Sequence, residues 1–165
     1  MAVLKSRGMK ILKIVHLLGV ACWLGGAVSM IMLNLSSVGA DREGMLYGIN
    51  FSSHVLDMWV VITLGLGTCV LTGLIYGLLT PWDFFRLRWV AVKWAVTAFC
   101  FASGWLFLGR WEAALLAMSE AAGNGALQEA AYRQVRALHL AGSLVQVALL
   151  IFLVAVSVIR PWKRR

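Results

Sequence analysis

Five ionisable side chains lie within apolar stretches of this sequence, where water cannot solvate them: His16, His54, Asp57, Lys93 and His139. An ionisable group in hydrocarbon is costly, so such groups commonly mark sites for ions, protons or cofactors. Imidazole is an axial ligand of haem iron, and a carboxylate can hold an imidazole tautomer or receive a proton. These five residues are therefore the first candidates for chemistry.

His16 and Lys93 are predicted to lie at one depth. His16 is about two helical turns into the first apolar stretch, and Lys93 is about one turn into the third from the same side. The two residues could face one site in the inner half of a membrane, and with Asp57 they are the catalytic candidates. The ordinary interpretations are a lysine that reaches to the interface and a hydrogen-bonded interior histidine.

His54 and His139 form a second predicted pair, because each begins an apolar stretch at the opposite face. Helical bundles hold haem by bringing two such histidines to one level. Asp57, one turn from His54, could hold an imidazole tautomer or accept a proton, although it also suits a partly solvated interface. Gly19 and Gly142 follow His16 and His139 by three residues. These two glycines could make room for a macrocycle or let helices pack closely.

Membrane-spanning helices must position these side chains. Hydrophobic residues make up 61% of the chain and charged residues 13%, with a mean hydropathy of +0.84, which is unlike a soluble domain. We predict one all-α domain over residues 1–165, an integral membrane antiparallel four-helix bundle with spans of about 9–33, 54–79, 89–108 and 138–159. Glycines predict a loop over 36–53, and residues 110–136 are expected to be helical on both sides of a break at Gly123-Asn124-Gly125.

Basic residues gather at one face of the predicted bundle, where they outnumber the acidic residues: Lys5, Arg7, Lys10, Lys13, Arg86, Arg88, Lys93, Arg160, Lys163, Arg164 and Arg165. Lys and Arg accumulate on the cytoplasmic side of short loops, so both termini are expected in the cytoplasm. The net charge of +8 is explained by this topology. Nucleic acid is not an expected partner, because the bases form no stripe with interleaved aromatic residues.

The first span, KIVHLLGVACWLGG, resembles the opening helix of a group of small bacterial membrane proteins, the HemJ-type protoporphyrinogen oxidases and the CopD-like copper-resistance domain. The shared motif is a histidine, seven residues to a tryptophan, then glycine. Leu71-Thr72-Gly73-Leu74 and Trp89 followed by Lys93 also match the HemJ type. The resemblance implies haem b, functional roles for His16 and Lys93, a cofactor-binding role for Trp23, and a multi-pass place in the bacterial inner membrane. That family usually has a tyrosine and an arginine after the motif, where residues 27–33 of this chain have neither.

The residues and the resemblance together favour a haem b-binding membrane protein that acts in electron transfer or in porphyrin or quinol oxidation. It would hold one or two haems, with the iron ligands among His16, His54 and His139. Lipid, a quinone or quinol, or a porphyrinogen would be its partners, and whether it is an enzyme or a homo-oligomer stays open.

Two alternatives come from other functional classes. One is a CopD-like transport protein for copper or another small species, with His16, Met30, Met32 and Met58 as soft ligands. The other is a helper subunit without a cofactor, whose histidines only form hydrogen bonds between helices.

Overall fold

The computed structural model describes residues 6–79 and 88–159, and its elements are helices joined by short turns. The α-helices are α1 (Ser6–Ser36), α2 (Met45–Val55), α3 (Thr68–Leu79), α4 (Arg88–Ser103), α5 (Gly109–Ala122) and α6 (Ala130–Ile159). Wider π-helical segments, η2 (Leu56–Gly67) and η3 (Gly104–Leu108), join α2 to α3 and α4 to α5. Tighter 3₁₀ turns, η1 (Ser37–Gly39) and η4 (Gly123–Gln128), follow α1 and α5.

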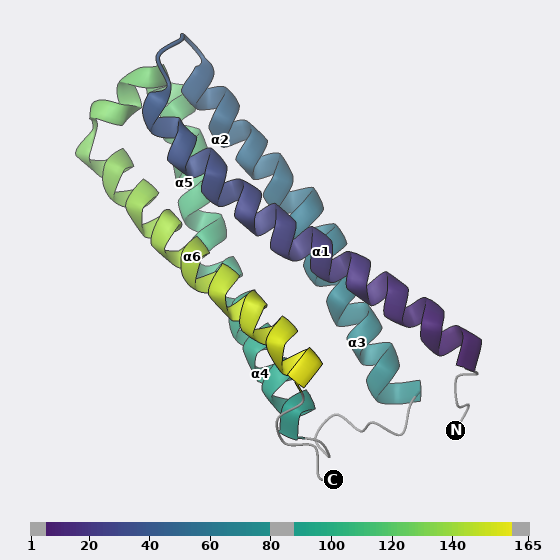
Figure 1. The fold of residues 1–165 in the computed structure, drawn as a ribbon. Coiled ribbons are helices and arrows are strands. Elements are labelled where there is room, and N and C mark those ends of the chain that lie inside the picture. Colours follow the sequence, from purple (N-terminus) through teal and green to yellow (C-terminus); the bar gives the residue numbers. More distant parts are fainter. Residues whose placement is uncertain (1–5, 80–87, 160–165) are drawn as a thin grey trace.

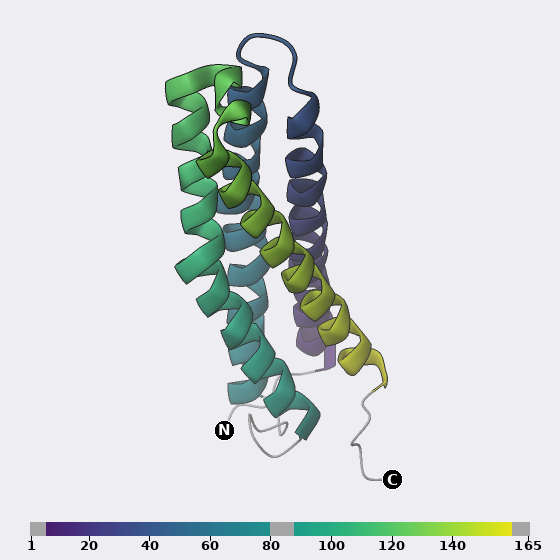
Figure 2. The ribbon, with the colours of Figure 1, turned by 90° about the vertical axis from the view of Figure 1, so that its left-hand side faces the viewer.

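Within residues 6–79 and 88–159, four helical stretches are long and apolar enough to cross a membrane: Ser6–Gly39, Met45–Leu79, Arg88–Gln128 and Ala130–Ile159. They form an all-α four-helix bundle in which successive helices run in opposite directions (Figures 1 and 2). We call the end that holds residues 6, 79, 88 and 159 the inner end, following the predicted orientation. The predicted inner bases Lys5, Arg86, Arg160, Lys163, Arg164 and Arg165 lie outside the described residues.

The helices are longer than the predicted spans, and the prediction of a loop over 36–53 is wrong for most of that segment. Helix α2 already begins at Met45, so the connection after η1 is short. Gly44 has the positive φ of 73° that favours glycine and serves the turn, whereas Gly48 is an ordinary helical residue. The predicted break at Gly123 is confirmed, because α5 ends at Ala122 and Gly123 has a φ of 54°.

The outer end of the bundle has a small core of its own, which we call the outer cap. The 34-residue helix Ser6–Gly39 is about 51 Å long, whereas a bilayer's hydrocarbon core is about 30 Å thick. The helices therefore extend past the hydrocarbon. The buried apolar residues of the cap come from separate segments and are Ala40, Leu46, Leu115, Ala126 and Tyr132.

Asn124 stabilises the outer cap through two hydrogen bonds. Its side-chain Oδ1 accepts a hydrogen bond from the backbone N–H of Leu46 at 3.2 Å, and its Nδ2 donates to the carbonyl of Arg42 at 2.6 Å. One amide side chain thus ties η4 to the start of α2 and to the turn before it. Leu46, which donates one of these hydrogen bonds, and Ala126, two residues after Asn124, are completely buried.

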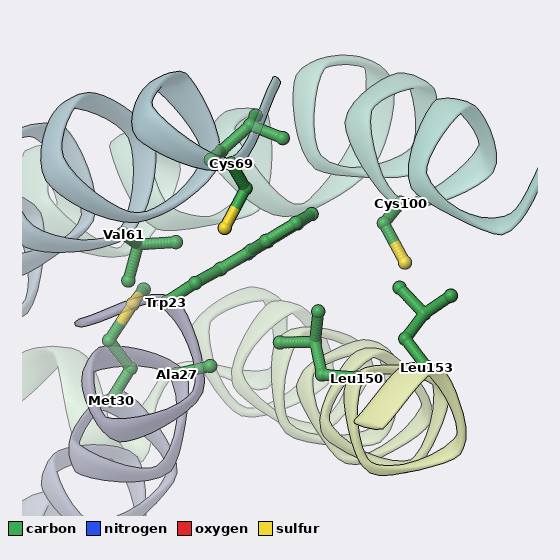
Figure 3. Packing of buried hydrophobic residues seen from close by; sticks show 9 residues of the cluster. Trp23, Ala27, Met30, Val61, Cys69, Cys100, Leu150 and Leu153 are labelled. Atoms are coloured by element: carbon green, nitrogen blue, oxygen red, sulfur yellow. The ribbon is translucent and has the colours of Figure 1, made fainter. Parts of the chain in front are cut away.

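The main core lies in the middle of the bundle, where α1 and η2 approach most closely. A Cβ added to Gly65 would lie 2.6 Å from the Cα of Trp23, so only glycine fits there. The indole of Trp23 extends from α1 into the core, towards side chains of α3, α4 and α6 that include Cys69, Cys100 and Leu150 (Figure 3). Towards the inner end, the pair α1–α3 and the pair α4–α6 diverge (Figure 1).

Candidate functional site

His16 is held by Thr72 of the neighbouring helix α3. The His16 Nδ1 lies 2.7 Å from the Thr72 Oγ1, and that hydroxyl donates its single hydrogen to backbone carbonyls of its own helix, at 2.6 Å from Thr68 and 3.2 Å from Cys69. The hydroxyl oxygen must therefore accept from His16, which places the imidazole hydrogen on Nδ1. A neutral imidazole carries one hydrogen, so the Nε2 lone pair of His16 remains available to a ligand or a proton.

One aromatic ring and one charged side chain lie near this half-buried histidine. The ring of Tyr76 on α3 stands edge-on to the imidazole, with the ring centroids 6.4 Å apart. Lys93 on α4 lies close enough to His16 to interact electrostatically, and its ammonium group sits 5.9 Å from the ring centroid of Trp89. His16 and Lys93 thus lie in the inner part of the bundle, within electrostatic range of each other.

Gly19 and Trp23 continue the face of α1 that begins at His16. A Cβ on Gly19 would lie 3.0 Å from the side chain of Thr68 and 3.3 Å from the Cys69 Sγ, so this glycine permits helix packing and borders no open slot. Trp23 is 3% exposed, and its indole N–H has no acceptor among the described residues. A buried donor without a partner is unusual in proteins.

His139 lies in the outer half of the bundle, and its tautomer is the opposite of that of His16. The Asn34 Nδ2 donates to the backbone carbonyl of Arg136 at 3.3 Å and is also 3.3 Å from the His139 Nδ1. If the side-chain amide of Asn34 were flipped, its Oδ1 would face the carbonyl oxygen of Arg136, which is unfavourable. The Nδ2 of Asn34 is therefore the donor, the Nδ1 of His139 is the acceptor, and the hydrogen of the imidazole is on Nε2. That nitrogen lies 3.7 Å from the Oε2 of Glu112, which is 3% exposed.

A cavity of about 10 Å³ lies against this pair, lined by Asn34, Ile49, Asn50, Ser53, Glu112, Leu115 and His139. Three buried atoms of this pair have no hydrogen-bond partner among the described residues: both carboxylate oxygens of Glu112 and the Nε2 of His139. Asp57, one turn along from Ser53, is close enough to interact electrostatically with both Glu112 and His139. The outer half therefore contains an enclosed polar centre of water-molecule size.

His54 does not line the cavity of His139. It is half-buried and borders a different groove of about 200 Å³, together with the exposed residues Val55, Met58, Trp59 and Thr63. The residue before it, Ser53, faces the internal cavity, and one step along a helix turns a side chain by roughly 100°. Gly142 borders no open space for a macrocycle, because a Cβ there would lie 2.8 Å from the side chain of Leu108 and 3.2 Å from that of Trp111.

Sequence reasoning missed Glu112, Asn34 and Thr72 as site residues. Glu112 shares a helical stripe with the buried Leu115 and Ser119, and a carboxylate on such a stripe was a signal in the sequence. Asn34 continues the apolar face of Ala27, Met30 and Ile31, and a polar residue on such a face was the available signal.

Ligand geometry and relatives give no further assignment. In residues 6–79 and 88–159, no three or more His, Cys, Asp or Glu side chains are grouped so that they could hold a metal ion. Comparison of the chain with protein-family models, with curated proteins and with solved structures finds no match in any of the three. Function is therefore inferred from this chain's own residues.

Proposed function

We propose that this protein binds haem b through His16 and acts in electron transfer or in quinol or porphyrin oxidation. The observation that carries this proposal is the tautomer of His16, whose Nδ1–H is given to Thr72 while the Nε2 lone pair stays available. Metal-binding histidines are commonly held in this way, with the second ring nitrogen donating to an acceptor. When bound, haem b supplies one-electron transfer at iron.

The residues of the inner end fit such a group in their chemistry. His16 offers the axial nitrogen, with its Nδ1 held by Thr72 of the neighbouring helix. The positive charge of Lys93 beside His16 suits an acidic substituent of a porphyrin. The unpartnered indole N–H of Trp23, two turns from His16 on the same face, suits an oxygen of a quinone or porphyrin.

The outer residues do not fit a second haem. The two nitrogens of His139 face Asn34 and Glu112, and the adjoining cavity of about 10 Å³ has the volume of a single water molecule. His54 borders a separate groove. We therefore propose one haem, at the inner end, with Lys93 as a positioning residue for the bound porphyrin.

The distribution of bases and the motif of the first span support a place in the bacterial inner membrane with both termini in the cytoplasm. In this orientation His16 and Lys93 belong to the cytoplasmic half of the bundle. Electrons would then enter from a membrane-dissolved quinol or from a porphyrinogen, both of which reach this depth from the bilayer.

An absorption spectrum of the purified full chain, oxidised and then reduced with dithionite, tests the proposal. The protein should show a Soret band and sharp α and β bands after reduction, and His16→Ala should abolish them. His54→Ala, a histidine change of the same kind at the outer groove, is the matched control and should leave them intact. A colourless protein from cells supplied with haem precursor would overturn the proposal in favour of metal transport or a helper subunit.

Thr72 provides a second test, because its hydroxyl oxygen holds the imidazole of His16. Thr72→Val keeps the shape of the side chain and removes the acceptor. Loss of such a supporting hydrogen bond typically lowers metal affinity by about 10- to 100-fold. Titration of the haem-free protein should show this loss in Thr72→Val and recovery in Thr72→Ser. Equal affinity in all three proteins would remove the proposed role of the tautomer.

A further inference from the structure

The outer half of the bundle contains a polar pair that the haem proposal does not use. Glu112 of α5 and His139 of α6 are 3% and 2% exposed, with 3.7 Å between the Oε2 and the Nε2. The site lies near Asn34, which is about 27 Å from His16 along α1 at 1.5 Å per residue. The two centres are therefore separate in space and can be tested separately.

A carboxylate in this position needs compensation. Removing an ion from water costs several kcal/mol even after the protein relaxes, so buried groups are usually paired, hydrogen-bonded or neutralised by a proton. His139 is too far from Glu112 for a hydrogen bond, and both Glu112 oxygens are buried without a partner. Some further species must complete this site.

The cavity against the pair has the size and the polar lining for one water molecule. A water there would accept from the His139 Nε2–H and donate to Glu112 and to the Asn34 Oδ1, which is also buried and unpartnered. Three hydrogen bonds are the usual number for a buried water. Such a water would join the acid and the imidazole into one hydrogen-bonded unit.

Charged and polar groups face the pair from three elements, η2, α6 and α2. Asp57 faces it from η2, and two neighbouring carboxylates are costly to ionise together. On α6, besides His139, the guanidinium of Arg136 is engaged with the carbonyl of Asn34 at 3.2 Å. From α2, Asn50 adds no charge, since its amide donates to the Leu115 carbonyl and the Tyr132 hydroxyl.

We propose that Glu112, the bridging water and His139 form a proton-binding site. Leu46, Ala126 and Tyr132 of the outer cap are completely buried, and Tyr132 accepts a hydrogen bond from Asn50, which lines the cavity. The buried face of α6 continues from His139 through Ser143 and Gln146 towards the middle of the bundle. That polar face gives a proton a direction of exchange that does not cross the cap.

Infrared difference spectra of the full chain, recorded as the pH is changed, test the proposal. The C=O stretching band of a protonated carboxyl group lies in a part of the infrared spectrum with few other protein bands. This band should be absent from the spectra of Glu112→Gln. Glu120→Gln, an exposed glutamate on the same helix, is the matched control and should keep the band. His139→Leu should change the frequency of the band, because the imidazole N–H that hydrogen-bonds to the bridging water is lost.

Three results would overturn the proposal. The band could survive Glu112→Gln and vanish in Asp57→Asn, which would place the proton on the other carboxyl. Saturating Na⁺ could abolish the band at constant pH, which would make the site a cation site. The third test uses the wild-type chain, so it does not depend on the folding of a variant. Dicyclohexylcarbodiimide reacts with protonated carboxyl groups, and the extent to which it labels Glu112 should fall as the pH rises. Labelling of Glu112 only after unfolding would contradict the proposal.

Discussion

Replacing Gly65 with alanine should loosen the closest contact between two helices of the bundle. The new Cβ would lie 2.6 Å from both the Cα and the Cβ of Trp23 and 2.8 Å from its backbone nitrogen. Backbone atoms cannot turn aside, so η2 and α1 would have to move apart along their whole contact. Overpacking of this kind costs about 1–3 kcal/mol, from which about 1 kcal/mol is recovered through the better helix propensity of alanine.

Gly67 is the matched control, because it lies in the same π-helical segment and is exposed. A Cβ there would meet only the carbonyl of Ile62, at an ordinary 3.4 Å. Gly67→Ala should therefore stabilise the protein by about 0.5–1 kcal/mol through helix propensity alone. Reversible unfolding in mixed detergent micelles, followed by far-ultraviolet circular dichroism, measures both variants. Equal free energies of unfolding for the two would refute the close contact.

Three further changes test buried or hydrogen-bonded polar side chains. Tyr132→Phe removes the hydroxyl that accepts from the Asn50 Nδ2 at 3.1 Å, and should lower the free energy of unfolding by about 1 kcal/mol. Asn124→Ala removes the acceptor of the Leu46 N–H and should speed hydrogen exchange of that amide about tenfold, as expected for the loss of about 1.4 kcal/mol. Gln146→Leu replaces a buried amide whose Oε1 has no partner, and should stabilise the bundle by about 1 kcal/mol.

Each of these changes has an internal control and a contrary result. Tyr47→Phe on the exposed face of α2 and Gln134→Leu on the exposed face of α6 should leave stability nearly unchanged. Amides in the middle of α6 should exchange at the same rate in Asn124→Ala as in the wild type. A loss of stability in Gln146→Leu would mean that the amide holds a polar group, and unchanged stability in Tyr132→Phe would mean that its hydroxyl contributes nothing.

The fold could be predicted from the sequence because long apolar runs have few structural solutions in a bilayer. The start of α2 could not, since Gly44 and Gly48 look alike in the sequence and only Gly44 takes a positive φ. The outer cap was also hidden. Its core residues, such as Ala40, Leu46 and Tyr132, are scattered over the chain and come together only when α2, α5 and α6 have been placed.

The candidate site was predictable in depth but not in direction. Counting turns from the span ends placed His16 and Lys93 at one level, and the structure has them near each other. The same counting paired His54 with His139, but the face that a residue presents depends on how the helix is rotated. The buried stripe of α2 passes through Ser53, so His54 points to another groove. Hydrogen-bond partners, and with them the tautomers, become known only from the packed structure.

The close contact between α1 and η2 at Gly65 also limits which helices can move relative to one another. Gly65 and Gly26 lie in close contact with the facing helix, and Asn124 joins segments of the outer cap by hydrogen bonds, so we expect the helices to move least there. Towards the inner end the pairs α1–α3 and α4–α6 lie farther apart (Figure 1). A molecule that binds near His16 is therefore expected to change the distance between these pairs more than it changes the contact at Gly65.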